Sequence, residues 1–493
     1  MGVASFRRAD DIPEMAGLPK EDIQSALRSI ALAIQSAGGK VYKVGGCVRD
    51  ELLGLKSKDF DLEVFGVDSG TLSSLLRSLN PVDEVGKQFG VFKLSGLPID
   101  VALPRRERKV ASGHRGFSTE ADPKMSLDSA ATRRDFTINA IYQEVLTGVL
   151  VDPVGGAEHL RKRRLVHVSS AFGEDSLRVL RGMQLVARFD LDVDPDTVDL
   201  CRSIQGDDLP IERVGEEFFK LITQGREIGR GLKFLSEVGW LRYFPELEAL
   251  QGCQQDPAWH PEGDVWTHTL HCLDKFAKER LGDAREDWIV GLAVLCHDLG
   301  KPETTVFENG RWKSPRHEYV GVSVAERFLK RITQEHALVT SILPLVECHM
   351  RPFQLFKDNA KDSAVRRLAN KVKRIDRLLR VCRADKLGRP PLVPEGFPEL
   401  DSLEKQAAEL KLADSGPQPI LLGRHLIAQG MEPSKAFKGM LEVAFEAQIE
   451  GEFFDEVGAV EWLKRTMNRN FRYNIDSLRR PKDPERETTQ SGE

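Results

Sequence analysis

Asp59 and Asp61 are separated by one residue in the segment KDFDLE, a spacing that could bring two carboxylates together. On an extended strand, residues i and i+2 share a face, so both acids would point one way while Phe60 and Leu62 point the other way. Adjacent carboxylates repel each other unless a cation lies between them, and Mg²⁺ is often held by one or two carboxylates together with substrate phosphates. A solvated pair at an exposed strand end is the alternative interpretation.

A glycine turn precedes these acids. The segment 41–63 (VYKVGGCVRDELLGLKSKDFDLE) predicts a strand, a turn, a short helix and a second strand. Gly45 and Gly46 allow a tight turn and a close approach of backbone to a ligand. Their N–H groups, together with Arg49, could bind a triphosphate, which favours the metal interpretation of the nearby acids.

The combination of GGCVRD and KDFDLE resembles the signature of class II tRNA nucleotidyltransferases (CCA-adding enzymes) and of the related bacterial poly(A) polymerases. The resemblance implies an α+β fold, in which a polymerase-β-like nucleotidyltransferase head of mixed sheet and helices precedes an all-α neck, an HD body and a helical tail. It implies that Asp59 and Asp61 hold catalytic Mg²⁺, while Gly45, Gly46 and Arg49 bind the triphosphate.

Further elements of the head follow from local pattern. Residues 20–37 and 71–79 predict helices, and residues 89–94 and 99–103 predict strands. Asp100 could be a third metal carboxylate, although single exposed acids are common on strands. The polar, glycine-containing stretch 104–127 predicts a loop. In CCA-adding enzymes a flexible loop at this place takes part in switching from C to A addition, and the RERK-like element here favours the ability to add A.

The segment RRDFTINA, residues 133–140, resembles the RRDFTxNA motif of this family. Arg134 can fork onto phosphate oxygens. Asp135 can accept a hydrogen bond from a sugar hydroxyl, and Asn139 can orient either residue. A helix start with Asp135 as its cap is the alternative, and it leaves the two preceding arginines unexplained.

Asp175, Arg178 and Arg181 are spaced three apart on a helical pattern that extends to Phe189. Ion pairing within the helix is one interpretation. The family resemblance implies a protein template instead, in which Asp175 and Arg178 hydrogen-bond the base edges of CTP or ATP. Arg181 would then lie at the triphosphate or base edge, and Arg213 would brace this helix.

Histidines gather after Pro257 in a pattern that resembles the HD phosphohydrolase superfamily. The implied H…HD…D metal ligands are His268, His297, Asp298 and Asp385, with His317 and His349 as ligands of a second metal. Imidazoles and carboxylates suit a divalent transition metal or Mg²⁺. A metal-activated water could attack phosphorus, with Lys301 contacting a phosphate. A domain retained only for packing and RNA shape is the alternative.

Composition limits the class of protein. The 493-residue chain is 41% hydrophobic and 30% charged, values typical of a globular protein. It shows no apolar run long enough to span a bilayer and no apolar centre of a signal peptide. Seven dispersed cysteines without CxxC spacing predict reduced thiols and a cytoplasmic location. A net charge of −5 excludes a uniformly basic RNA-binding surface, so RNA contact is expected at local basic clusters. These are Arg105–Lys109, Arg161–Arg164, Arg366–Arg383 and Lys464–Lys482.

We therefore expect five segments. They are a nucleotidyltransferase head (1–165), a neck with the nucleotide-selecting helix (166–252), an HD metal-binding domain (253–395), a helical RNA-binding tail (396–475) and a disordered end (476–493). The predicted reaction is template-independent addition of C and A from CTP and ATP to the 3′ end of the tRNA acceptor arm, with release of pyrophosphate.

Two alternatives remain open at this point. A poly(A) polymerase, or an enzyme that adds only CC or only A, shares all of these motifs. In the second alternative the HD domain is the working enzyme, a metal phosphohydrolase, and the head is a non-catalytic RNA-binding platform. Neither the oligomeric state nor the identity of the HD metal follows from the sequence.

Overall fold

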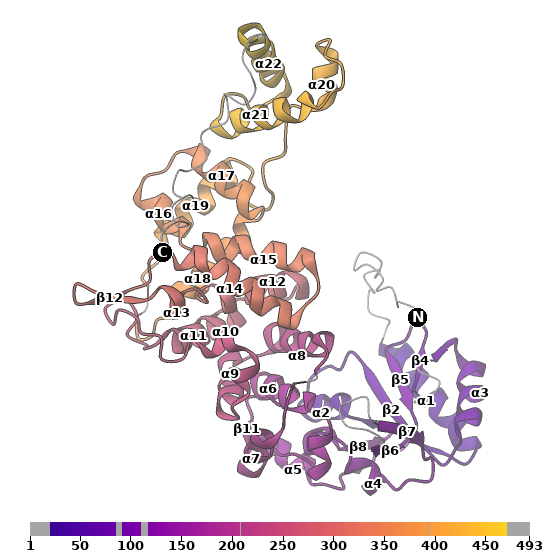
Figure 1. Ribbon diagram of the computed structural model, residues 1–493. Helices are drawn as coiled ribbons and strands as arrows, with labels where there is room; N and C mark the ends of the chain where they lie inside the picture. The colour runs from indigo at the N-terminus through magenta and orange to yellow at the C-terminus, as the bar shows by residue number, and fades with distance from the viewer. Residues whose placement is uncertain (1–19, 85–90, 110–116, 208, 393, 471–493) are drawn as a thin grey trace, which may run out of the picture. The chain divides into compact units, whose positions relative to one another are not determined.

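The computed structural model describes residues 20–84, 91–109, 117–207, 209–392 and 394–470 (Figure 1). The chain divides into two compact units, with the boundary between Phe244 and Pro245. Each unit is described separately below. None of the helices within these ranges is both long enough and apolar enough to cross a membrane.

A mixed seven-stranded sheet organises the first unit. Its strands are β1 (Lys40–Val44), β2 (Phe60–Phe65), β3 (Val82–Glu84), β4 (Val91–Leu94), β5 (Ile99–Ala102), β8 (Tyr142–Glu144) and β9 (Leu150–Val151). The spatial order is β3-β4-β5-β2-β1-β8-β9. β2 and β5 run parallel, whereas the other neighbouring strands are antiparallel. The predicted mixed sheet of the head is therefore confirmed.

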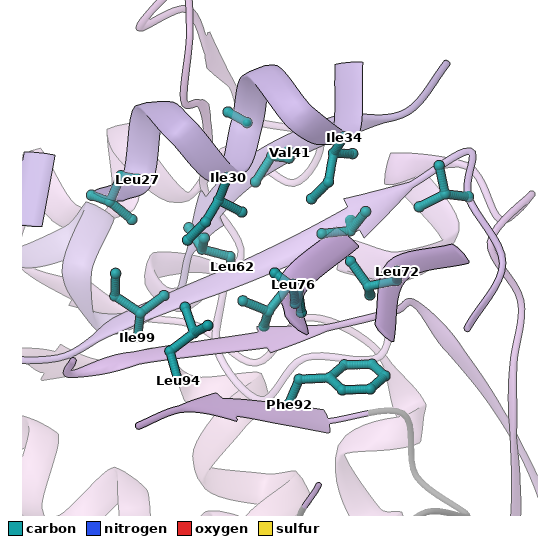
Figure 2. Packing of buried hydrophobic residues seen from close by; sticks show 14 of the residues in the cluster. Leu27, Ile30, Ile34, Val41, Leu62, Leu72, Leu76, Phe92, Leu94 and Ile99 are labelled. Carbon is teal, nitrogen blue, oxygen red and sulfur yellow. The ribbon is translucent and has the colours of Figure 1, made fainter. Parts of the chain in front are cut away.

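One face of the sheet is covered by α1 (Lys20–Ser36) and α3 (Ser69–Leu79). Figure 2 shows Leu27, Ile30 and Ile34 pointing from α1 toward the strands. Burying an aliphatic side chain of this kind contributes about 1.5–3 kcal/mol. This apolar layer fixes which residues of each strand face inward.

The opposite face carries the polar residues of β2 beside a second, smaller apolar cluster that includes Tyr42, Val44 and Tyr142. Along β2, Leu62 and Val64 enter the apolar layer, so Asp61 and Glu63 must point to the other side. Four short helices lie near this face: α2 (Gly46–Leu52), α4 (Leu127–Ala131), η2 (Thr137–Asn139) and α5 (Gly156–Arg161). The alternation predicted from sequence thus separates the core from the candidate site.

The predicted loop between residues 104 and 127 is wrong for the residues that form two strands. β6 (Arg105–Lys109) pairs with β7 (Phe117–Ala121) in an antiparallel hairpin. The register is continuous from Arg105↔Ala121 to Lys109↔Phe117, so the backbone polar groups of this stretch are paired with each other. Residues 110–116 lie outside the described part of the chain.

The neck is built mainly from α6 (Leu177–Phe189), α7 (Pro195–Ser203), α8 (Ile211–Gln224) and α9 (Ile228–Glu237), with η3 (Ser170–Glu174) and η4 (Trp240–Tyr243). It also contains β11 (Asp192–Val193), which pairs in parallel with β10 (Arg164–Leu165), so the neck is not purely helical. α6 packs closely on α9 because Gly231 has no side chain. A Cβ at this position would lie 2.6 Å from the carbonyl oxygen of Met183.

The second unit is helical, as predicted, apart from a hairpin of β12 (Val306–Glu308) and β13 (Arg311–Lys313). Its first helices are α10 (Pro245–Glu248), α11 (Val265–Lys278), α12 (Ala284–Cys296), α13 (Lys301–Thr304) and α14 (His317–Ile332). They are followed by α15 (His336–Cys348), α16 (Arg351–Lys357), α17 (Asp362–Val372) and α18 (Ile375–Leu387). The residues of α12 from Asp287 to Cys296 are all buried, which makes α12 the central helix.

The tail differs from its predicted start. α19 (Pro398–Glu409), assigned to the tail from sequence, packs on α16 and α18 and buries Leu400, Leu403 and Ala407. The helices α20 (Gly423–Ala428), α21 (Ala436–Glu450) and α22 (Glu456–Asn470) form a separate small core around Phe453 and Trp462. The predicted disordered end lies outside the described residues.

Gly156→Ala should destabilise the head. A Cβ at Gly156 would overlap the carbonyl oxygen of Thr137, and backbone cannot rotate away as a side chain can. Overpacking of this kind costs about 1–3 kcal/mol. Urea unfolding followed by circular dichroism should show an earlier transition for this variant. Gly396→Ala, which meets open space, is the matched control. An unchanged midpoint for Gly156→Ala would contradict this packing.

Candidate functional site

Three carboxylates lie in neighbouring positions at the polar face of the sheet. Asp61 on β2 is the register neighbour of Asp100 on β5, and Asp59 lies one residue before β2. Asp59 and Asp61 lie at the surface, although neighbouring protein atoms displace part of the water around the Asp61 carboxylate. Lost solvation raises the pKa of Asp61, and the negative charges of Asp100 and Asp59 raise it further, against the opposing charge of Arg134. An ion with hard oxygen preference, such as Mg²⁺, fits this donor set and would relieve its repulsion.

The glycine turn lies directly beside this acidic cluster. Gly45 has φ +80°, a left-handed conformation that glycine adopts readily. A Cβ at Gly45 would lie 3.4 Å from Asp61 Oδ2 and 3.9 Å from Arg134 Nη1. Gly46 then begins α2. The turn, an acid and a guanidinium predicted separately from sequence therefore converge.

Arg134 is held in a fixed orientation. Its Nη2 donates to Glu63 Oε2 at 2.8 Å, its Nε donates to the Tyr142 hydroxyl at 3.2 Å, and its guanidinium lies 5.4 Å from the Tyr142 ring centroid. Sequence reasoning missed Glu63 and Tyr142. Glu63 shares its strand face with Asp61, so the alternation of β2 contained a signal for it. Because Glu63 and Tyr142 bind the other nitrogens of Arg134, its Nη1 remains on the side of Gly45.

Arg49 makes contacts within the protein and is not exposed to a ligand. Its side chain is buried, and its Nη1 donates to Asn139 Oδ1 at 2.7 Å. Its Nε and Nη2 donate to Asp50 Oδ1, and its guanidinium lies 4.3 Å from the Phe189 ring centroid. The predicted triphosphate contact of Arg49 is therefore not supported. Its partners make it a link between α2, η2 and the end of α6.

Asp135 continues the same buried network. Its Oδ2 lies 2.9 Å from Arg181 Nε, while its Oδ1 accepts from the Phe136 N–H at 2.7 Å and from Asn139 Nδ2 at 3.1 Å. Burial alone would raise the pKa of Asp135, but Arg181 and these hydrogen bonds outweigh it, so the pKa is lowered. Asp135 does not cap η2, whose cap position is Phe136.

The base-selecting residues predicted in the neck are also braced. Asp175 lies just before α6 and forms an ion pair with Arg213 Nη2 on α8 at 2.8 Å, in agreement with the bracing role expected for Arg213. Arg178 donates Nη1 to the Ala171 carbonyl and Nη2 to the Arg133 carbonyl, each at 2.8 Å. Arg178 thereby joins the start of α6 to the segment that carries Arg134.

The six predicted HD ligands converge in the second unit. His268 is on α11, His297 and Asp298 directly follow α12, His317 begins α14, His349 directly follows α15, and Asp385 is on α18. All six are buried. Elements more than a hundred residues apart in the chain thus contribute to one cluster.

Three of the histidines are oriented by backbone carbonyls. His297, His317 and His349 each donate Nδ1–H to a carbonyl oxygen, which leaves Nε2 with its lone pair directed into the cluster. The accepting oxygens belong to Val294, Ser314 and Val346, at 2.7, 2.8 and 2.7 Å. The Nε2 atoms of His317 and His349 are 3.2 Å apart. Burial, with the charges of His317 and His297, lowers the pKa of His349 to about 3, so His349 is neutral, the form that binds metal.

Asp298 lies between two groups of donors. Its Oδ1 is 3.4 Å from His317 Nε2, and its Oδ2 is 3.2 Å from His297 Nε2. The His297 Nε2 atom is buried and makes no hydrogen bond within the described residues, a fit to a bound cation. Lys301, predicted to contact a phosphate, instead lies buried with Nζ 2.7 Å from Asp298 Oδ2, and it donates to Gln255.

His268 and Asp385 complete the cluster. His268 Nε2 is 3.1 Å from Asp385 Oδ1, and Nδ1 is 2.7 Å from Glu262 Oε1. Arg389 Nη2 donates to Asp385 Oδ1 at 2.6 Å. Glu262 and Arg389 were not identified from sequence, because neither belongs to the H…HD…D pattern.

The donors separate into groups whose ligand atoms all lie within 4.8 Å of one another. One group contains His268, Cys272, His297 and Asp385, and another contains Asp298, His317 and His349. A third combines His260, Glu262 and His268. The first two groups could each hold an ion, with Asp298 next to both. Mixed nitrogen and oxygen donors suit a divalent transition metal.

The basic cluster Arg366–Arg383 is not a free phosphate-binding patch. Arg374 and Arg377 form ion pairs with Glu286, and Arg380 pairs with Asp287. Arg367 pairs with Glu450 of α21. These cations stabilise contacts between helices, so the predicted RNA contact at this cluster is not supported.

Comparison with known proteins places the chain in a family. Residues 41–166 match the Poly A polymerase head domain, and residues 265–388 match the HD domain. The Multifunctional CCA protein of Xanthomonas campestris pv. campestris is 35% identical over 408 residues, which cover 77% of this chain and 95% of that protein. This chain belongs to the multifunctional CCA protein family. The Stenotrophomonas maltophilia member is 35% identical over 387 residues, covering 74% of this chain and 90% of that protein.

Solved structures of CCA-adding enzymes share the fold. The Bacillus stearothermophilus CCA-adding enzyme in complex with CTP aligns with a TM-score of 0.58 and 22% identity, over 92% of this chain and 100% of that chain. The Thermotoga maritima CCA-adding enzyme complexed with tRNA aligns with a TM-score of 0.54 and 18% identity, over 91% and 96%. The family and the fold class predicted from sequence are confirmed.

Asp135→Asn should make the unfolding free energy of this CCA family member less dependent on pH in the acidic range. The pKa of Asp135 is lowered on folding, so its charged form stabilises the fold above the ordinary carboxyl pKa of about 4. That stabilisation is lost as the pH falls through the lower folded-state pKa. The variant should lose about 3 kcal/mol of unfolding free energy at pH 7. The difference from the wild type should shrink below about pH 4.

Urea unfolding at a series of pH values measures this difference. Asp128→Asn, an exposed residue of α4, is the control and should change stability by less than about 0.5 kcal/mol. The ordinary carboxyl pKa is about 4. If the difference in unfolding free energy between Asp135→Asn and the wild type stayed constant from about pH 5 to about pH 3, the lowered pKa of Asp135 would be contradicted.

Proposed function

We propose that this chain adds C and A nucleotides from CTP and ATP to the 3′ end of tRNA and releases pyrophosphate. The observation that carries the proposal is the convergence of Asp61, Gly45 and Arg134 beside two further carboxylates, in a chain of the multifunctional CCA protein family. An acidic cluster next to a glycine turn and a guanidinium is what phosphoryl transfer from a triphosphate requires.

Asp59 and Asp61 are the proposed Mg²⁺ ligands, and Asp100 is a candidate third. Asp100 also forms an ion pair with Lys93 at 3.0 Å, which reduces its availability compared with Asp61. A bound Mg²⁺ would lower the pKa of the RNA 3′-hydroxyl and stabilise the leaving pyrophosphate. The magnesium requirement itself is part of this proposal.

Backbone N–H groups at Gly45 and Gly46, together with Arg134, are the proposed triphosphate contacts. Arg134 suits this task because Glu63 and Tyr142 fix its guanidinium before any nucleotide arrives. A pre-oriented guanidinium loses little conformational entropy on binding phosphate.

Asp175 and Arg178 are the proposed readers of the base. Cytosine and adenine each present an exocyclic amine beside a ring nitrogen acceptor, so a carboxylate can accept from the amine while a guanidinium donates to the ring. A carboxylate has about four acceptor sites and a guanidinium five donors. Both residues can therefore contact a base while keeping the bracing bonds that orient them.

Arg181, Asp135, Asn139 and Arg49 are proposed as positioning residues. Their buried contacts connect helix α6, which carries the base readers, to the turn that follows β1. This assignment replaces the direct nucleotide contacts expected for them from sequence. Its physical reason is that Asp135, Asn139 and Arg49 already use their polar atoms within the protein. Arg181 is included because its Nε is paired with Asp135, although 43% of its side chain is exposed.

The RNA product should end in CCA. Incubation with CTP, ATP, Mg²⁺ and tRNA lacking its last three nucleotides, followed by sequencing, should show addition of C, C and A and then arrest. Long runs of A would support a poly(A) polymerase instead. Arrest after CC, or use of ATP alone on a tRNA that ends in CC, would support a partial-specificity enzyme.

Asp61→Asn is the matched test of the head. It should lower the rate of nucleotide addition by at least about 10²–10³, the loss typical when transition-state charge stabilisation is removed. Asp83→Asn, an exposed acid elsewhere on the same sheet, should retain the wild-type rate. Full addition by Asp61→Asn would contradict the catalytic role of Asp61, whereas absence of addition by the wild type would support the alternative in which the head is only an RNA platform.

A second activity is favoured by the HD cluster. We propose that its two donor groups hold divalent ions and that the domain hydrolyses phosphate esters, such as a phosphomonoester or a 2′,3′-cyclic phosphate. The supporting observation is the buried, unbonded Nε2 of His297 among three imidazoles that are oriented by carbonyls. A bound ion would supply an activated water.

A cytoplasmic location is also proposed; the seven free cysteines agree with it.

Asp298→Asn should remove this second activity and spare the first. Asp298 is adjacent to both donor groups, so its loss should lower hydrolysis of p-nitrophenyl phosphate and of 2′,3′-cyclic AMP by at least about 10²-fold. CCA addition should remain. Removal of metal with a chelator should reproduce the loss, and added metal should restore it. Equal hydrolysis by the variant and the wild type would contradict the role of Asp298, and absence of hydrolysis by the metal-loaded wild type would support a domain retained only for packing.

A further inference from the structure

Cys272 belongs to the HD donor cluster, although the H…HD…D pattern does not include it. It lies on α11 one helical turn after His268, so the two side chains share a face. Cys272 is fully buried, and its Sγ is 3.3 Å from His268 Nε2. This Nε2 is the imidazole nitrogen that would bind a metal, because Nδ1 is held by Glu262.

The separations match donors that share one ion. Two atoms bound to a tetrahedral Zn²⁺ at about 2.0–2.3 Å lie about 3.3–3.8 Å apart. In this cluster the sulfur–nitrogen separation between Cys272 and His268 is 3.3 Å, at the lower end of this range, whereas His268 Nε2 and Asp385 Oδ1 are 3.1 Å apart and would have to separate slightly to share an ion. The sulfur also lies within 4.8 Å of the ligand atom of each other member of its group.

The surrounding fold leaves room for this sulfur. Gly388, which follows α18, has no side chain, and a Cβ there would overlap Cys272 Sγ. Ordinary apolar packing can also place a cysteine in a core. A separate observation favours a ligand: His297 Nε2, in the same donor group, is buried with 1% of the residue exposed and has no hydrogen bond in the described chain.

We propose that Cys272 Sγ is a direct metal ligand in the HD domain, and that it makes the ion held with His268, His297 and Asp385 a thiophilic transition metal rather than Mg²⁺. This inference depends on the proposed metal function of the HD domain. Mg²⁺ prefers oxygen donors, whereas a thiolate favours softer ions such as Zn²⁺ or Co²⁺. On binding, the thiol releases its proton to solvent and the sulfur donates an electron pair to the ion, with no change of oxidation state.

The two donor groups then differ in kind. The group with Cys272 offers one sulfur, two nitrogens and one carboxylate, the number of protein ligands typical of a closed structural zinc site. The group of Asp298, His317 and His349 offers three ligands, the number typical of a catalytic site with an open position. We therefore assign a structural role to the first ion. The second ion would keep an open coordination position for substrate.

Cobalt loading of the full-length protein tests this assignment directly. The metal-free protein is titrated with Co²⁺, and near-ultraviolet absorption is recorded, because sulfur-to-cobalt charge transfer appears there only when a thiolate is bound. The wild type should show the band, and Cys272→Ser and Cys272→Ala should lose it. Cys253→Ser, which lies in the same unit but outside these donor groups, should keep it. Two substitutions are used because a buried hydroxyl could itself disturb folding, which thermal unfolding would report.

Zinc affinity gives a second measurement. Competition with a chromogenic chelator should show at least about a 100-fold loss for Cys272→Ala, since loss of even an outer contact to a ligand costs 10–100-fold. A wild type that binds Co²⁺ without the band, or a band that persists in Cys272→Ser, would overturn the role of Cys272 while leaving the HD metal site in place. Absence of Co²⁺ binding in the wild type would overturn both.

Discussion

The ion pair between Asp135 and Arg181 is the contact on which the arrangement of the first unit depends. It joins the segment after the hairpin to α6, and through Asn139 and Arg49 it continues to the glycine turn. A buried carboxylate is costly unless paired, so each member of this chain of contacts needs the next. The residues that would hold phosphate and those that would read a base are therefore parts of one rigid assembly.

The HD cluster follows a related rule with a different result. The last turns of α12 and α15, and the turn before α14, supply carbonyl oxygens that fix Nδ1 of three imidazoles, so that their remaining nitrogens face the cluster. Lys301 and Arg389 partly neutralise the two carboxylates, but imidazole acceptors that converge without a donor remain unfavourable, and a bound cation would relieve this. The central helix α12 can deliver its His–Asp pair to this point because neighbouring helices bury it on all sides.

The amino-acid sequence predicted most secondary-structure elements and the types of the candidate metal-binding side chains, because both depend on local spacing. Alternation in β2 predicted the face of Asp61, and the order of the histidines and acids predicted which side chains converge in the second unit. The sequence could not show that Arg49 and Lys301 are used internally, since their partners Asn139 and Gln255 are distant in the chain. Polarity alone made 104–127 resemble a loop, whereas strand pairing across the hairpin decided its structure. The spacing of Cys272 from His268 was visible in the sequence, but only the fold shows that their ligand atoms meet.

The pairing of the arginines between Arg366 and Arg383 with acidic neighbours has a consequence for turnover. Cations already neutralised by Glu286, Asp287 and Glu450 release few counterions when a polyanion arrives. These arginines therefore contribute little charge to nucleic-acid binding, and an RNA bound elsewhere on the chain would gain little salt-dependent affinity from them. Lower electrostatic affinity for RNA favours release of the finished product, which an enzyme needs for each turnover.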